Sequence, residues 1–72
     1  MQRETVAIPH WKFVDDHNAA SIFGWDMDRL YYMQSYNSFP IPVRHGQIMA
    51  IKTDRIVMWA KNRDYNVTRY TV

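Results

Sequence analysis

The chain has 72 residues, a formal net charge of +2 and 47% hydrophobic residues, which fits one small domain with a thin core. Eleven aromatic residues supply the bulky side chains that such a core needs, and the absence of cysteine excludes disulfides and cysteine zinc sites. The N-terminus lacks the features of a signal peptide and no apolar run approaches the roughly 20 residues of a membrane helix, so we expect a soluble cytoplasmic protein with no membrane partner.

Charge is distributed unevenly along the chain. Residues 1–38 carry three basic and five acidic side chains, for a net charge of −2, whereas residues 39–72 carry six basic and two acidic side chains, for a net charge of +4. A basic half indicates a polyanionic partner, nucleic acid first. A solvated surface rich in lysine and arginine explains the same pattern equally well.

The N-terminal segment, residues 1–13, is predicted to be an arm or a short strand. Residues 4–8 alternate weakly between polar and apolar side chains, and Pro9 ends the run.

Two short helices joined at a glycine are predicted next. The first runs from Asp16 to Phe23, with Asp15 as its N-cap and Gly24 as a left-handed stop. The second runs from Met27 to Ser35, with Asp26 as its N-cap. Helices joined so tightly cross steeply, as in a helix-turn-helix, which places the start of its second helix in the DNA major groove.

A β-hairpin and a third helix follow. Residues 41–43 and 47–52 are predicted strands, with Gly46 in the tight turn between them. Thr53 is expected to cap a helix over residues 54–62. That helix has one apolar face, formed by Ile56, Trp59 and Ala60.

The tail, residues 64–72, alternates as well and is predicted to be either a strand or disordered. As a strand it would pair with residues 4–8, within one chain or between neighbouring chains.

One stretch resembles a known group of proteins. "FPIPVRHGQ" (residues 39–47), the apolar strand after it and the short helix ending in "MWAKNR" (residues 58–63) look like the excisionase and Cox-type regulators of temperate phages and the bacterial AlpA-like regulators. The resemblance covers about residues 14–63. It implies a single domain over residues 1–72 that is mainly α with a small β-hairpin, a winged helix-turn-helix of the MerR and excisionase kind.

The resemblance also implies a non-catalytic function. Such a protein is a recombination directionality factor that binds repeated DNA sites, bends the DNA, directs integrase toward excision and regulates a lysogeny promoter. The implied partners are double-stranded DNA with attachment-site or promoter repeats, integrase, and further copies of the chain that assemble cooperatively on DNA. The implied location is the cytoplasm of a bacterial host, at the nucleoid when bound. Two alternatives stay open, a plain promoter repressor and a protein-binding anti-repressor.

The resemblance also implies which residues contact DNA, by their positions in the recognition helix and the wing. In the recognition helix they are Met27, Asp28, Arg29, Tyr31, Tyr32 and Ser35. In the wing they are Arg44, His45 and Gln47. Recognition helices of this group are usually rich in arginine, whereas this one has Arg29 beside two aspartates.

The tyrosine pair has a geometric constraint. Adjacent helix residues point about 100° apart, so Tyr31 and Tyr32 cannot both share the core face of Leu30. At least one is therefore exposed, and Tyr32 is our choice for groove contact.

Other residue classes are interpreted as structural. The three tryptophans, Trp11, Trp25 and Trp59, are expected in the core, and Phe39 is expected to dock the hairpin on the helices. No serine, histidine and acid form a nucleophile constellation and the histidines show no ligand spacing, so we expect no enzyme, no metal and no cofactor.

Overall fold

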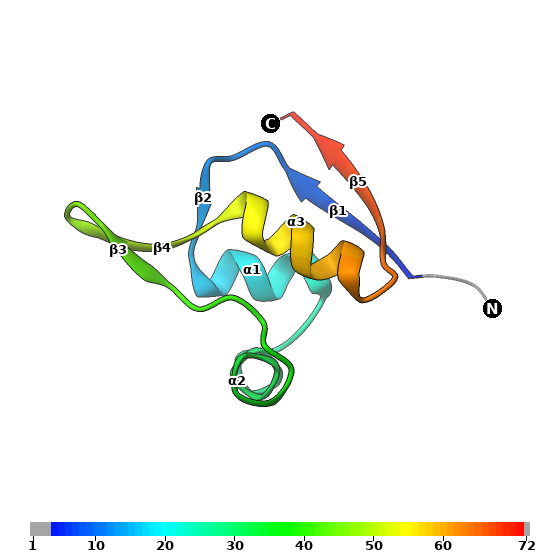
Figure 1. Ribbon diagram of the computed structural model, residues 1–72, viewed down its shortest axis with the longest axis horizontal. Helices are drawn as coiled ribbons and strands as arrows, with labels where there is room; N and C mark the ends of the chain where they lie inside the picture. The colour runs from blue at the N-terminus through cyan, green and yellow to red at the C-terminus, as the bar shows by residue number, and fades with distance from the viewer. Residues whose placement is uncertain (1–3, 72) are drawn as a thin grey trace.

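The computed structural model describes residues 4–71; residues 1–3 of the predicted arm and residue 72 of the predicted tail lie outside the described part. The elements are, in order, β1 (Thr5–Pro9), β2 (Phe13–Val14), α1 (Asp16–Phe23), α2 (Met27–Tyr36), β3 (Val43–His45), β4 (Ile48–Lys52), α3 (Thr53–Asn62) and β5 (Asn66–Tyr70). Figure 1 shows α1 and α3 in the middle, β1 and β5 on one side, α2 below, and the β3–β4 hairpin projecting from the opposite side.

The expected fold class, mainly α with a small β-hairpin in a winged helix-turn-helix, is wrong. The described residues hold three helices and five strands, with 41% helix and 29% strand, which makes a small α/β protein. Three strands besides the hairpin make the difference between the expected and the observed fold class. β1 and β5 form a two-stranded sheet, and β2 joins the hairpin in a three-stranded sheet of order β2-β4-β3.

The two ends of the chain meet in the parallel β1–β5 sheet. Its register runs from Thr5 opposite Asn66 to Pro9 opposite Tyr70. The sheet forms because the alternation at each end puts apolar side chains on one face: Val6 and Ile8 are buried and Val67 packs partly buried against the same core. Of the two pairings left open by the sequence, the structure shows the one within a chain.

The first strand of the hairpin, β3, begins two residues later than expected, at residue 43 in place of residue 41. Gly46 takes the left-handed backbone conformation of the turn, with φ of 67°, as expected. The strand β2 was missed because two residues are too short to show alternation.

The predicted helix boundaries are close to those observed. Asp15 caps α1 by accepting a hydrogen bond of 2.8 Å from the Asn18 backbone, and Gly24 ends the helix with φ of 72°. The predicted cap of α3 is wrong: the helix begins at Thr53 itself and has no side-chain cap, since Thr53 is buried and its Oγ1 has no hydrogen-bond partner within residues 4–71.

Aromatic rings fill the centre of the core. Phe39 is 2% exposed, and its ring lies 4.9 Å from Trp59, 5.4 Å from Trp25 and 5.5 Å from Phe23, measured between ring centroids. Edge-to-face packing of this kind adds to the hydrophobic gain of burial. The prediction for Trp11 is wrong, because its side chain is 39% exposed, outside this cluster.

Shortening Phe39 is expected to destabilise the fold severely. Phe39→Ala should lower the free energy of unfolding by about 3–5 kcal/mol, because it leaves a cavity between α2 and α3, whereas Phe39→Leu should cost about 1 kcal/mol. Ile41→Ala is a matched exposed control, with an expected change within about 0.5 kcal/mol. Urea unfolding measures all three; similar losses for the Phe39→Ala and Ile41→Ala variants would contradict the central position of Phe39.

Candidate nucleic-acid interface

Helix α2 has a capped start and a C-terminal end that is tied to α3. At its start Asp26 Oδ1 accepts a hydrogen bond of 2.7 Å from the Arg29 backbone N–H, which makes Asp26 the N-cap. Just past its end the Asn37 carbonyl accepts from Trp59 Nε1 at 2.9 Å and from Arg63 Nη2 at 2.6 Å. Both contacts come from α3 and the residue after it, so the direction of α2 is set by α3.

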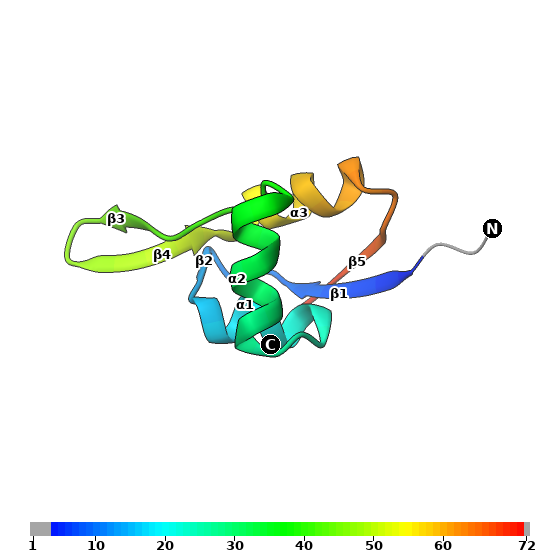
Figure 2. The same ribbon diagram turned by 90° about the horizontal axis from the view of Figure 1, so that it is seen from below.

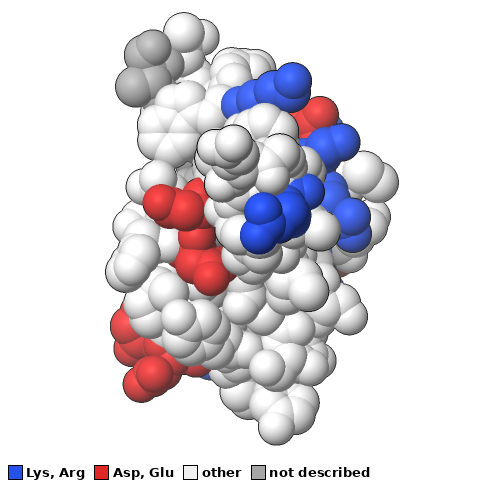
Figure 3. All heavy atoms as spheres, turned by 90° about the vertical axis from the view of Figure 1, so that its left-hand side faces the viewer, with Lys and Arg blue, Asp and Glu red and all other residues white. Residues whose placement is uncertain are grey.

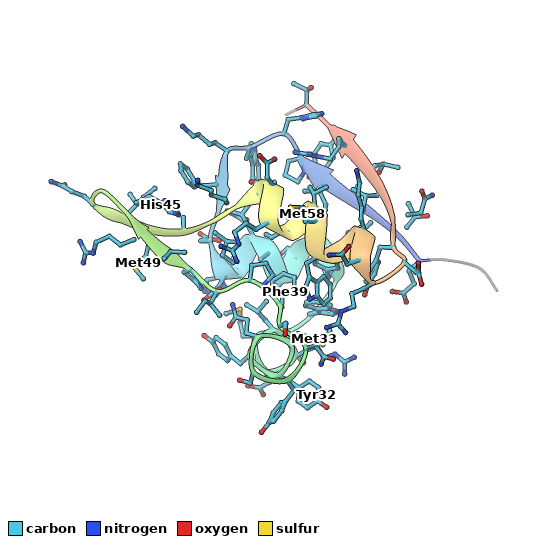
Figure 4. The ribbon with its side chains drawn as sticks, viewed as in Figure 1. Tyr32, Met33, Phe39, His45, Met49 and Met58 are labelled. Carbon is cyan, nitrogen blue, oxygen red and sulfur yellow. The ribbon has the colours of Figure 1, made fainter. Side chains whose placement is uncertain are left out.

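One face of α2 packs on the body and the other is open to solvent. Leu30 and Met33 are buried against the core. Figure 4 shows Met33 and Phe39 between α2 and the rest of the molecule, with Tyr32 pointing away from the opposite side of the helix.

The open face carries most of the residues predicted to contact DNA. Its exposed side chains are Asp28, Arg29, Tyr31, Tyr32, Ser35 and Tyr36. Tyr31 and Tyr32 are 51% and 52% exposed, so the expectation of at least one exposed tyrosine is confirmed for both.

Arg29, Tyr32 and Tyr36 form a ladder along this face. The Arg29 guanidinium lies 5.8 Å from the Tyr32 ring centroid, and the rings of Tyr32 and Tyr36 lie 5.0 Å apart. Tyr36 was missed by the sequence prediction, which ended the helix at Ser35. Its position four residues after Tyr32 was the signal that could have found it.

Met27 differs from the other predicted helix residues. Its side chain is partly buried and packs against the core cluster. We therefore leave Met27 out of the proposed contact surface.

The hairpin is an arm that extends well beyond the body beside α2, as Figures 1 and 2 both show. Arg44 and Gln47 at its tip are exposed, and Arg44 Nη1 lies 3.5 Å from the Gly46 carbonyl oxygen. The link between α2 and the arm is tied down by Gln34, whose Nε2 donates to the Pro40 carbonyl at 3.3 Å.

His45 lies in the sheet rather than at its outer surface. Its ring packs at a tilt against Phe13 with 4.6 Å between centroids, and its Nε2 is buried with no hydrogen-bond partner within residues 4–71. The two rings lie on strands that flank β4, on one face of the three-stranded sheet. This half-buried position makes His45 a packing residue, and we leave it out of the contact surface too.

Basic side chains that the family resemblance did not include lie at the base of the hairpin. Lys12 precedes β2, Lys52 ends β4 opposite Phe13, and Arg55 is in the first turn of α3; all three are exposed. Figure 3 looks onto the hairpin end and shows Lys and Arg side chains gathered in its upper right and central part, with Asp and Glu side chains both among them and toward the left and lower left. Basic side chains therefore predominate on one part of this end and acidic side chains on another.

Exposed apolar side chains accompany the charges. Four lie on the hairpin or just before it, and a fifth lies on α3: Ile41, Val43, Ile48, Met49 and Met58. Met49 lies on the hairpin in Figure 4, well away from the core.

The described residues show no cluster of three or more histidine, cysteine, aspartate or glutamate side chains that would hold a metal ion. None of the helices in residues 4–71 combines the length and the hydropathy that crossing a bilayer requires.

Comparison with known proteins found no matching family model, no matching curated protein and no matching solved structure.

Two neighbouring aspartates at the start of α2 are expected to differ in their contribution to stability, because only Asp26 caps the helix. Asp26→Ala should lower the free energy of unfolding by about 1 kcal/mol, because the Arg29 N–H loses its acceptor. Asp28→Ala removes the same charge from the first turn but no cap, and should cost less than about 0.5 kcal/mol. Thermal unfolding of the two variants at low salt measures the difference, and equal losses would show that charge alone stabilises this end.

Proposed function

We propose that this chain binds double-stranded DNA in a sequence-specific manner, with the open face of α2 and the projecting hairpin on one duplex. The observation that carries the proposal is the arrangement of these two elements. A helix whose C-terminal end is tied to α3 presents a free polar face, and an arm with Arg44 near its tip extends from the segment after it. A major groove about 12 Å wide admits such a helix, while an arm beside it reaches the phosphate backbone.

The α2 face has the donors and acceptors that base readout uses. The Arg29 guanidinium can donate two hydrogen bonds to guanine, and Asp28 can accept from the amino group of cytosine. Tyr32 offers a hydroxyl and a flat apolar ring to phosphate, sugar or thymine methyl groups. Asp26 adds a further negative charge at this helix end, so we expect the helix to add specificity more than affinity.

Affinity would come from the hairpin and its base. Arg44 and Gln47 at the tip, with Lys12, Lys52 and Arg55 behind them, are exposed donors, and four of the five are positively charged. Phosphate contacts of this kind release counterions and act on any sequence.

The biological role we propose is that of an excisionase or Cox-type regulator, on the strength of the motif in residues 39–47 and 58–63. In that role the chain binds repeated sites with further copies of itself, bends the DNA, and acts with an integrase or at a promoter. Bending of a fragment that carries several repeats, measured by circular permutation in gels, is expected for this role. Binding without bending would favour a plain promoter repressor.

A second candidate function, protein binding, is favoured by the exposed apolar side chains. Tyr36 lies on α2, Val43 and Met49 lie on the hairpin, and Ile41 lies on the segment between them. An apolar partner surface would cover all four. Such a complex would depend weakly on salt, whereas DNA binding weakens steeply with it.

A titration of labelled duplex DNA, followed by fluorescence anisotropy at about 50 mM and about 200 mM salt, tests the main proposal. Arg44→Ala should weaken binding to every duplex and reduce the slope of log affinity against log salt by about one unit. Lys61→Ala removes the same charge from an exposed position in the last turn of α3 and should leave the slope unchanged. Absence of binding at about 50 mM salt would rule out the DNA proposal and leave protein binding.

A further inference from the structure

Strand β1 has one unpaired edge. Its ladder with β5 begins at the hydrogen bond from Asn66 N to Glu4 O, of 2.8 Å, and ends at the one from His10 N to Tyr70 O, of 2.9 Å. In a parallel ladder alternate residues bond to each side, so the N–H and C=O groups of Thr5 and Ala7 point to the other edge. Within residues 4–71 those groups have no backbone partner there.

A groove runs along this edge, between β1 and α1. It consists of two hollows of about 230 Å³ and about 320 Å³ that adjoin at Ile22 of α1. The smaller one is flanked by Ala7 and by two half-exposed rings, Trp11 and Tyr70. The larger one is flanked by Glu4 and Tyr65, so the two hollows together follow the first three residues of β1, 5–7.

We propose that this groove binds an extended peptide segment of a partner protein, which adds to β1 as a third strand. The Thr5 and Ala7 main-chain groups would pair with the peptide backbone, and the two hollows would take alternate side chains, as in other cases of strand addition. The wall formed by α1 keeps the peptide against the strand edge. This inference does not depend on DNA binding.

The chemistry of the groove specifies which side chains the peptide carries. Of the eleven residues that line the hollows, Glu4 is the only charged one. Its carboxylate is near the Tyr65 hydroxyl, and burial together with this carboxylate raises the pKa of Tyr65. A lysine or arginine of the peptide therefore fits the Glu4 end, and an aromatic or large apolar side chain fits between Trp11 and Tyr70.

The location of the groove allows a ternary complex. β1 and β5 lie at the other end of the molecule from the hairpin in Figures 1 and 2. A peptide on β1 would leave the hairpin and the open face of α2 uncovered. The protein can then hold a protein partner at one end and its other ligand at the opposite end.

The test uses the full chain and a capped synthetic hexapeptide with lysine at one end, phenylalanine at the other, and alternating valine and threonine between them. Binding, followed by amide NMR signals, should shift the Thr5 and Ala7 amides and slow their hydrogen exchange. Ala7→Pro should weaken binding about tenfold, because it removes an outward N–H and spares the β5 ladder. Ala7→Ser keeps the N–H with little change in the volume of the side chain that lines the smaller hollow, and it serves as the control.

Charge preference is measured with the same peptide. Glu4→Gln should weaken binding of the lysine peptide about threefold. Its affinity should then equal that of a peptide that has norleucine in place of lysine. Unchanged signals of β5 and equal urea midpoints verify that each variant is folded.

Three results would overturn the proposal. The first is that the amide NMR signals of Thr5 and Ala7 do not shift at millimolar concentrations of the peptide. The second is equal binding of a peptide whose alternate backbone nitrogens are methylated, which would show that no strand is added. The third is self-association of the free chain in sedimentation that Ala7→Pro abolishes, which would assign the edge to a second copy. None of these results bears on the DNA titration, so the two proposals fail separately.

Discussion

The contact between α3 and the segment after α2 holds the rest of the structure in place. Trp59 packs edge-on against Phe39 and donates its indole N–H to the Asn37 carbonyl, which also accepts from Arg63. A 72-residue chain without disulfides has a thin core, so one such cluster carries much of its stability. Because the cluster fixes the end of α2 and the start of the link to the hairpin, it sets the direction of both elements.

The meeting of the two chain ends is the second constraint. β1 and β5 pair in parallel over the core, which closes the fold at one end, while the β3–β4 hairpin projects at the other. A two-stranded sheet necessarily has two open edges, and the edge of β1 is lined by α1. The same pairing that overturned the expected fold class therefore created the groove.

The two proposed binding surfaces differ in chemistry as well as in place. The hairpin and the open face of α2 combine arginine and lysine with exposed tyrosine and aliphatic side chains, whereas the groove at β1 has main-chain groups, aromatic rings and a single carboxylate. The first suits a polyanion, and the second suits an extended, basic peptide. A small protein with two such surfaces can connect two partners without a second domain.

Local signals in the sequence determined the helices, the aspartate caps of α1 and α2, the left-handed glycines and the exposure of at least one tyrosine on α2, because each depends on residues within one or two turns. Tertiary packing decided the rest. Alternation suggested that the tail pairs with residues 4–8, but the register and the choice of a pairing within one chain depend on segments about sixty positions apart. His45, Met27 and Trp11 were misplaced for the same reason: whether a side chain is buried depends on what lies opposite it in space, such as Phe13 against His45.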